Sequence, residues 1–383
     1  MNPKTIGSVI YIAIITLSSI YIPQPILPLL AQEFGTTAQN ASAITSITLL
    51  PMAFAPLFYG YFLENHQPKL ILSLSLFIAG FFQILLAWCE NLEIFLLLRF
   101  IQSLFFPAIL TTLLTILTRS QSGSLQFNVS IYIASTIAGG LFGRMGGAYL
   151  TELFSWQICF VLLGGSLILG GIFSISWIAN QTSQLARFTF SQILPLLSNK
   201  TSLVVLGSVF VMFFSFQAVL NTLPFYAKEM YPYISQNELG RLYLGYSIGI
   251  VVSLLANPII TLCGGREKTI FLSLNLFALG LCVFLLHSLM WIYVGMFVMC
   301  FGSFIAHSVL NALNNSLSPK YKAASSGLYL SFYYTGGTLG SYLSSFIFEL
   351  FGWQILIISL AIALSLTSFI FYHHTTYIKK NAQ

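Results

Sequence analysis

The sequence predicts an all-α membrane protein with twelve transmembrane helices in two similar six-helix bundles. Three observations predict it: the composition, the length of the apolar runs and an internal repeat. Of the 383 residues, 57% are hydrophobic and only 6% are charged, whereas soluble domains carry about 25% charged residues. The apolar runs last roughly twenty residues, the length of a helix that crosses a bilayer, rather than the roughly ten of a barrel strand.

The internal repeat indicates two copies of one unit. Residues 328–353 match residues 131–156 without a gap, sharing a tyrosine, three glycines and the ending Glu-Leu-Phe-x-Trp. A second motif, Leu-Pro-x-x-Ala-x-Glu, begins at Leu27 and again at Leu223. Both copies run in the same direction, so the bundles form a parallel pseudo-repeat. A binding site between such halves is an arrangement of membrane transporters.

The predicted spans follow one another along the chain. We expect residues 1–178 to form the N-terminal bundle, residues 179–200 a polar cytoplasmic linker, and residues 201–383 the C-terminal bundle with a short cytoplasmic tail. Within these units the apolar runs lie at about 6–30, 41–63, 70–89, 94–117, 128–153, 157–178, 201–226, 239–262, 269–288, 290–315, 325–350 and 354–374.

The charged residues predict the orientation of these helices. With an even number of spans both termini lie on one side, and that side holds eleven of the fifteen basic residues: Lys4, Lys69, Arg119, Arg187, Lys200, Arg266, Lys268, Lys320, Lys322, Lys379 and Lys380. The opposite side holds mainly acids: Glu33, Glu90, Glu93, Glu152, Glu229, Glu238 and Glu349, with Lys228 and Arg241. Because cytoplasmic loops collect Lys and Arg, we expect a multi-pass protein of the cytoplasmic (inner) membrane with both termini in the cytoplasm.

The two remaining basic residues, Arg99 and Arg144, lie inside predicted spans. A charge at such depth costs at least about 2.5–3.5 kcal/mol on insertion scales. The chain contains no Asp, and its nine Glu lie at span ends or in loops, so neither arginine has an obvious carboxylate partner. Each must face a wet cavity, bond to carbonyls and amides, or meet an anion. For Arg99 a clamp between neighbouring helices is an equal alternative, whereas Arg144 is favoured for the cavity.

Other polar side chains lie at membrane depth in several spans. Taken singly, each of them suits a bond between helices, but as a set they suggest a cavity between the two halves. Tyr329 and Tyr333 are one helical turn apart and share a face. The predicted substrate-binding residues are Tyr21, Gln24, Arg99, Arg144, Gln217, Asn221, Asn311, Tyr329 and Tyr333.

His307 is the only side chain at this depth that titrates near neutral pH. It is therefore the candidate for carrying a coupling proton. A neutral histidine that only accepts or donates a hydrogen bond is the open alternative.

Glycines recur at helical spacing in the fifth and eleventh spans, at Gly139, Gly140, Gly143 and Gly147 and at Gly336, Gly337 and Gly340. Small residues let helix backbones approach closely in lipid, so close packing is the expected role. A second interpretation is that these seams let the halves rock against each other.

Several motifs resemble those of the major facilitator superfamily. Arg99-x-x-Gln102 is similar to its R-x-x-Q-G motif, with Ser103 in place of Gly, and Gly60-x-x-x-Glu64 with Lys69 is similar to a worn form of its loop motif. A bacterial efflux-type subfamily of the inner membrane is similar in four further motifs: Tyr21-x-x-Gln24-Pro25-x-x-Pro28, Tyr132-Ile133-Ala134 with Gly143-Arg144, His307-Ser308, and Ala324-Ser325-Ser326-x-x-Tyr329-Leu330-x-x-Tyr333-Tyr334-x-Gly336. The resemblance implies two six-helix bundles, rocker-switch alternating access and proton antiport.

Together these features predict a secondary active transporter, not an enzyme, that exports a small organic molecule in exchange for protons. Two buried cations without buried anions favour an anionic substrate, because an unpaired positive cavity repels cations. An importer of a metabolite or metal chelate, or a non-transporting receptor, are the alternatives. We expect the bilayer, protons and a small molecule as partners, a functional monomer, no nucleic acid, no cofactor and no metal; the five scattered cysteines suit no metal site.

Overall fold

The computed structural model describes residues 3–64, 67–118, 125–178, 192–317 and 321–381, and every element in these ranges is helical. The elements in chain order are α1 (Pro3–Tyr21), α2 (Leu27–Glu33), α3 (Ala38–Glu64), α4 (Pro68–Leu86), α5 (Leu92–Ser103), α6 (Phe106–Thr118), α7 (Leu125–Leu153), α8 (Trp156–Trp177), α9 (Ile193–Ser198), α10 (Lys200–Met230), α11 (Gln236–Arg241), the 3-10 helix η2 (Leu242–Ser247), α12 (Ile248–Cys263), α13 (Arg266–Val283), α14 (Leu289–Leu317) and α15 (Lys322–Asn381).

Each of the twelve predicted spans coincides with helix, and the predicted all-α membrane fold is confirmed. Three spans that were expected to be continuous are instead interrupted, between α1 and α2, between α5 and α6, and through η2. Prolines explain the first two breaks, because a proline ring clashes with the carbonyl four residues earlier. Four residues before Pro25 is Tyr21, where α1 ends, and four residues before Pro107 is Ser103, where α5 ends.

The last two spans form one long element, α15, whose two arms meet at Gly352. Its backbone there has φ 77° and ψ 174°, a conformation that glycine adopts without the cost of a Cβ clash. The sequence therefore encodes a corner, and not a continuous helix, between the eleventh and twelfth spans.

Seven helical segments of the described chain are long and apolar enough to cross a membrane, and an eighth if the bent pair 236–252 and 255–263 is one span. One of the seven, residues 324–376, contains both arms of α15. The helices α3, α7 and α13 have 27, 29 and 18 residues and stand beside these segments in the same bundle.

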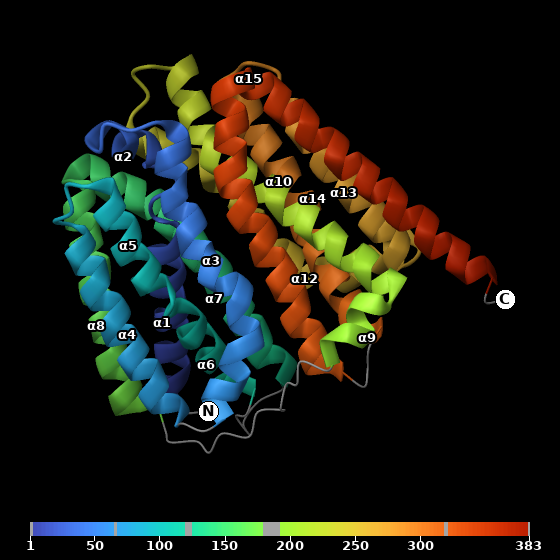
Figure 1. Cartoon of the computed structure of the whole chain (residues 1–383), viewed down its shortest axis with the longest axis horizontal. Helices are drawn as coiled ribbons and strands as arrows, with labels where there is room; N and C mark the ends of the chain where they lie inside the picture. The colour runs from blue at the N-terminus through green and yellow to red at the C-terminus, as the bar shows by residue number, and fades with distance from the viewer. Residues whose placement is uncertain (1–2, 65–66, 119–124, 179–191, 318–320, 382–383) are drawn as a thin grey trace.

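Buried apolar side chains gather on either side of the predicted linker. Two clusters of buried apolar residues consist of side chains between residues 9 and 178. A third consists of side chains between residues 196 and 371, together with Ile137. We call the described residues up to 178 the N-half and those from 192 on the C-half; they stand side by side in Figure 1, the N-half in blue to green and the C-half in yellow-green to red. Residues 179–191 of the predicted linker, including Arg187, lie outside the described residues, and its remainder forms α9 and the start of α10.

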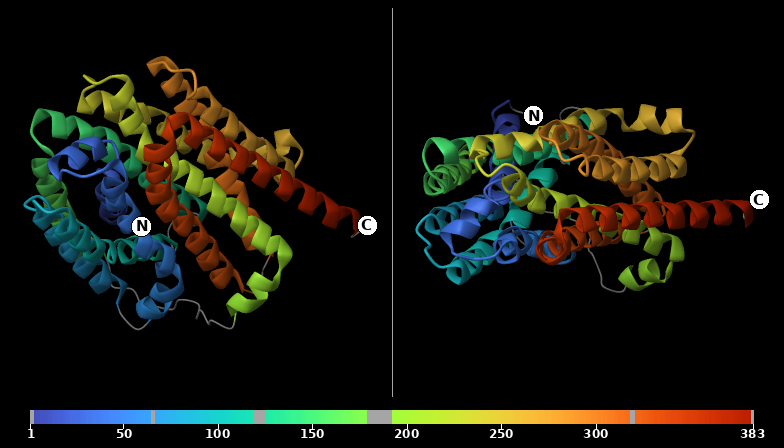
Figure 2. Two further views of the ribbon diagram at one scale, coloured as in Figure 1. Left: turned by 45° about the horizontal axis from the view of Figure 1, so that its top comes forward. Right: turned by 90° about the horizontal axis from the view of Figure 1, so that it is seen from above.

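The two ends of the bundle are named here by the helices that lie at each end. We call the end where α1 begins the proximal end, and the end that holds α2 and α11 the distal end, at the top of Figure 1. Seen from that end, the N-half and the C-half again lie next to each other (Figure 2, right).

The glycine seams pack helices within each half. A Cβ on Gly143 of α7 would lie 2.6 Å from the backbone of Ser18 in α1. At the equivalent place in the C-half, a Cβ on Gly340 of α15 would collide with the backbone of Phe214 in α10. Close packing within each half is thus confirmed at these glycines. Gly140 of the same seam faces the other half, because a Cβ there would lie 3.0 Å from the Tyr246 hydroxyl, so the interpretation of the seams as a contact on which the halves rock stays a prediction.

We expect Gly143→Leu to destabilise the folded protein. Overpacking typically costs about 1–3 kcal/mol, and here the obstacle is backbone, which has no rotamer to adopt. The thermal unfolding midpoint of purified protein in detergent should fall. The matched control is Gly146→Leu in the same helix, where a Cβ would have nothing within 4 Å of it; equal effects of the two changes would contradict the seam.

Candidate functional site

Arg144 lies between the two halves and is 1% exposed. It comes from the middle of α7, one turn after Gly140, whose carbonyl accepts a hydrogen bond from its Nη1 at 2.8 Å. Its Nε donates to Oε1 of Gln24 at 2.6 Å. In the part of the chain that the structure describes, no ion pair joins Arg144 to a carboxylate, so its positive charge is met only by dipoles and rings.

Gln24 connects this cation to the C-half. The residue lies in the turn between α1 and α2, and its Nε2 donates to Oε1 of Gln217 at 2.8 Å and to Oδ1 of Asn221 at 2.9 Å. Gln217 and Asn221 are one turn apart on α10, and all three side chains are fully buried. A single amide therefore links the guanidinium of the N-half to two amides of the C-half.

Three tyrosine rings surround the guanidinium. Its central carbon lies 4.1 Å from the ring centre of Tyr21, 4.7 Å from that of Tyr246 and 5.6 Å from that of Tyr243. A desolvated cation over an aromatic face is stabilised by roughly 2 kcal/mol. The tyrosines hold the charge in place without neutralising it, which leaves the cation available to an anion.

Arg99 is placed away from this cluster, inside the N-half. Its five hydrogen bonds go to Thr48 Oγ1 (2.8 Å), Gln83 Oε1 (3.1 Å), Gln102 Oε1 (2.7 Å) and the carbonyls of Ser19 (2.6 Å) and Ile20 (3.2 Å). These bonds use the donor capacity of a guanidinium, which has five N–H groups. The geometry favours the clamp alternative for Arg99 over a contact with substrate.

His307, Tyr329 and Tyr333 form a second group, in the C-half toward the proximal end. The Tyr329 hydroxyl lies 3.1 Å from Nδ1 of His307, and the ring of Tyr333 is centred 4.7 Å from the imidazole. Tyr333 also stacks on Phe213 at 3.6 Å. The two tyrosines share a helix face as predicted, and His307 is half-buried beside them.

Aromatic rings connect the two groups. From Tyr246, ring contacts run through Phe304 (5.1 Å), Phe216 (6.0 Å) and Phe213 (6.1 Å) to Tyr333. The polar cluster around Arg144 and the histidine group are therefore two ends of one aromatic wall on the C-half.

Asn311 stands apart from both groups. It lies one turn beyond His307 on α14, and its Oδ1 accepts a hydrogen bond from Asn315 at 3.3 Å. Of the nine predicted binding residues, the structure groups Arg144 with four others, Tyr21, Gln24, Gln217 and Asn221, and places two beside His307; Arg99 and Asn311 lie elsewhere.

Three residues of these clusters were missed from the sequence. Gln83 interrupts the apolar third span, and that single amide was a usable signal. Tyr243 and Tyr246 carried no signal, because the chain has 19 tyrosines and only the packing of η2 against α7 selects these two.

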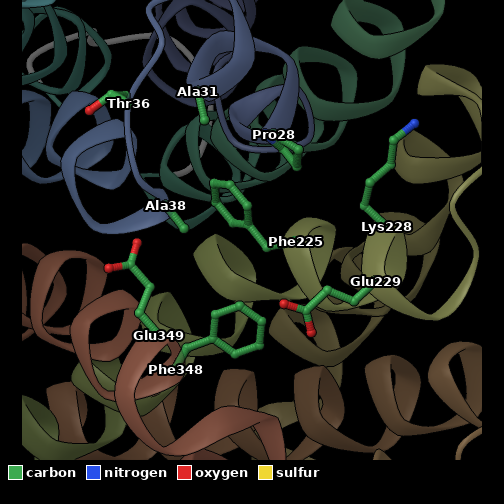
Figure 3. A pocket seen from close by; sticks show the side chains of 9 residues that line it. All are labelled: Pro28, Ala31, Thr36, Ala38, Phe225, Lys228, Glu229, Phe348 and Glu349. Atoms are coloured by element: carbon green, nitrogen blue, oxygen red, sulfur yellow. The ribbon is translucent and has the colours of Figure 1, made fainter.

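A hollow of about 520 Å³ opens between the halves at the distal end (Figure 3). Its lining comes from both halves: Pro28, Ala31, Thr36 and Ala38 from one, and Phe225, Lys228, Glu229, Phe348 and Glu349 from the other. Hydrogen bonds between the halves are found beside it, at Ser42 to Ser345 (2.6 Å) and Gln39 to Glu349 (2.7 Å).

A membrane-spanning bundle built from two repeated halves, with polar side chains joined across their contact, defines a membrane transporter. A family model described as "Major Facilitator Superfamily" matches residues 9–233 and 205–382 of this chain. The chain belongs to this superfamily, and the protein is accordingly a transporter rather than an enzyme.

Proteins similar to this chain are transporters. An uncharacterized transporter of Buchnera aphidicola subsp. Schizaphis graminum is 26% identical over 361 residues, covering 91% of this chain and 87% of its own. The inner membrane transport protein YnfM of Escherichia coli K12 is 26% identical over 345 residues, covering 88% of this chain and 82% of its own. In fold, the chain is similar to a bacterial homologue of the human lysosomal transporter Spinster, with a TM-score of 0.82, 12% identity and 97% of both chains covered.

We expect Arg99→Met to unfold more easily than the parent protein. The change removes the arginine donor from Thr48 Oγ1, Gln102 Oε1 and the carbonyls of Ser19 and Ile20, whereas Gln83 Oε1 keeps the hydrogen bond from Gln102. Each buried group left without a donor costs about 1–3 kcal/mol. Thermal unfolding in detergent measures the effect, with Arg241→Met, an exposed arginine, as control. A variant as stable as the control would show that Arg99 is not a clamp.

Proposed function

We propose that the protein exports a small organic anion across the cytoplasmic membrane in exchange for protons, by alternating access. The observation that supports this most directly is the bridge from Arg144 through Gln24 to Gln217 and Asn221. It places an uncompensated cation where both halves can contact the same substrate.

The chemistry of the bridge favours an anion. A carboxylate that takes the place of Gln24 Oε1 on Arg144 gains charge-assisted hydrogen bonds, which are roughly twice as strong as neutral ones. The displaced Gln24, with Gln217 and Asn221, supplies amides for the remaining polar groups of the substrate. The rings of Tyr21, Tyr243 and Tyr246 are suited to an apolar or aromatic body. Arg99 holds the N-half together and takes no part in binding.

The charge distribution supports an orientation. Among the described residues the proximal end carries Lys4, Lys69, Lys200, Arg266 and Lys268, whereas acids predominate at the distal end. By the positive-inside rule the proximal end faces the cytoplasm, and both termini with it. His307, nearer the proximal end, then carries the coupling proton.

Transport in everted membrane vesicles tests the proposal. Everted vesicles expose the cytoplasmic face, so an exporter loads them with labelled substrate. A panel of organic anions and cations, with and without a protonophore, separates charge preference from coupling. Anion loading that collapses with the protonophore is the expected result. Loading of cations only would refute the anion assignment, and loading in right-side-out vesicles only would make the protein an importer.

Arg144→Ala is expected to lower anion uptake at least about tenfold, because a hydrogen bond to a charged group contributes about 1.5–3 kcal/mol and each 1.4 kcal/mol is tenfold. Uptake is measured at equal amounts of membrane-inserted, folded protein. Arg144→Lys, which keeps the charge but not the planar donor pair, should fall between. Arg241→Ala serves as the control, and uptake by Arg144→Ala that equals this control would refute the role of Arg144.

His307→Gln is expected to separate exchange from accumulation. Glutamine fills a similar volume and bonds to Tyr329 but carries no proton, so uphill loading should be lost while exchange of labelled for unlabelled substrate persists. His287→Gln, which changes an exposed histidine at the distal end, is the matched control. Protonophore-sensitive accumulation by His307→Gln would assign coupling to another group.

A further inference from the structure

Two glutamates cross between the halves at the distal end. Glu152, at the end of α7, accepts a hydrogen bond at Oε2 from the backbone N–H of Asn237 in the first turn of α11, at 2.7 Å. Glu349, in α15, accepts one at Oε1 from the backbone N–H of Gln39 in the first turn of α3, also at 2.7 Å. The carboxylate of Glu152 in the N-half thus bonds to the C-half, and the carboxylate of Glu349 in the C-half bonds to the N-half.

The internal repeat relates the two contacts. Glu349 stands 197 residues after Glu152, in the shared ending Glu-Leu-Phe-x-Trp, and Asn237 stands 198 residues after Gln39. The two acceptors are equivalent positions of the repeat. The two donors differ in offset by one residue, but each is the second residue of its helix, because α3 begins at Ala38 and α11 at Gln236. The two bonds are copies of one interaction, related as the paired contacts of a two-fold interface are.

Each bond satisfies a group that its own helix leaves without an acceptor. The N–H groups of a first helical turn have no intrahelical partner, and a carboxylate near that end is favoured by the helix dipole. Both glutamates are exposed at the edge of the contact, so these bonds hold the helix ends together without being buried in the core.

The hydrogen bonds of Glu152 and Glu349 lie beside close contacts between the N-half and the C-half. Behind Glu349, the hydroxyls of Ser42 and Ser345 meet at 2.6 Å, and Ser46 donates to the Thr338 carbonyl at 2.8 Å. Behind Glu152, a Cβ on Gly240 would lie 2.6 Å from that of Ala148. The carboxylate of Glu349 borders the distal hollow and points toward Ala38 at the start of α3 (Figure 3).

We infer that Glu152 and Glu349 form a paired latch that holds the distal end closed, and that both bonds break in each transport cycle when this end opens. The inference rests on membership of the transporter superfamily and on these contacts. It does not depend on the substrate, the direction or the coupling ion. Removing both carboxylates shifts the protein toward the state that is open at the distal end.

Labelling of a buried cysteine measures that shift. Ser345 is 0% exposed beside the latch, so the thiol of Ser345→Cys reacts with a hydrophilic maleimide only when the distal end opens. The protein is reconstituted in lipid nanodiscs, where the reagent reaches both ends, and modification of this residue is followed by peptide mass spectrometry, which separates it from the five native cysteines. No substrate is needed, so failure here and failure of anion transport are distinguishable.

We expect Glu152→Gln with Glu349→Gln to raise the labelling rate at least tenfold, and each single change to raise it less. Glu152→Asp with Glu349→Asp keeps both charges but shortens their reach, and should also accelerate labelling if the bonds themselves close the end. The matched control is Glu33→Gln with Glu229→Gln, a second repeat-related acidic pair at the distal end for which the described structure gives no hydrogen bond across the halves.

An unchanged labelling rate in the Glu152 and Glu349 double variants, or an equal increase in the control pair, would overturn the latch. Size-exclusion profiles and thermal midpoints matching the parent establish that each variant is folded, and the Asp pair provides the decisive measurement should the Gln pair fail this check.

Discussion

The constraint on which the centre of this protein depends is a guanidinium buried between two halves, with no carboxylate partner among the described residues. A charge in that position is costly at membrane depth, and the chain meets the cost with dipoles and rings: one carbonyl, one amide and three tyrosine faces around Arg144. Because the amide of Gln24 also bonds to α10, the same contact that tolerates the charge joins the halves. In the proposed transport cycle, binding at the cation and movement of the halves would be linked through this one side chain.

Arg99 shows that an intramembrane arginine serves a different purpose when its donors are satisfied. Five hydrogen bonds to two glutamines, a threonine and two carbonyls draw α1, α3, α4 and α5 together. Its charge is spread over neutral acceptors, which leaves no donor for an anion. Two arginines of similar depth thus differ by their partners: one is bonded within the N-half and the other lies at its boundary with the C-half.

The repeat organises packing and closure at two separate places. Glycines on α7 and α15 let α1 and α10 approach their own bundles closely, so each half behaves as a packed unit. Hydrogen bonds between the halves are made by amides, hydroxyls and carboxylates at Gln24, Ser42, Glu152 and Glu349. Tight contacts at Gly240 on Ala148 and at Gly140 on Tyr246 also lie on this boundary, so the halves meet through both polar bonds and close packing.

The sequence by itself determined the membrane fold, its twelve spans, the repeat and the two intramembrane cations, because apolar length, periodic identity and charge are local properties of the chain. The motifs around Arg99 and Gly60 in addition indicated the superfamily. Only the tertiary structure decided that Arg99 is saturated while Arg144 is not, that Tyr243 and Tyr246 rather than other tyrosines surround the cation, and that Glu152 and Glu349 face helix ends of the opposite half. Those outcomes depend on which residues distant in sequence are brought within hydrogen-bond reach, and a distance of about three ångströms between helices is set by packing, not by composition or spacing.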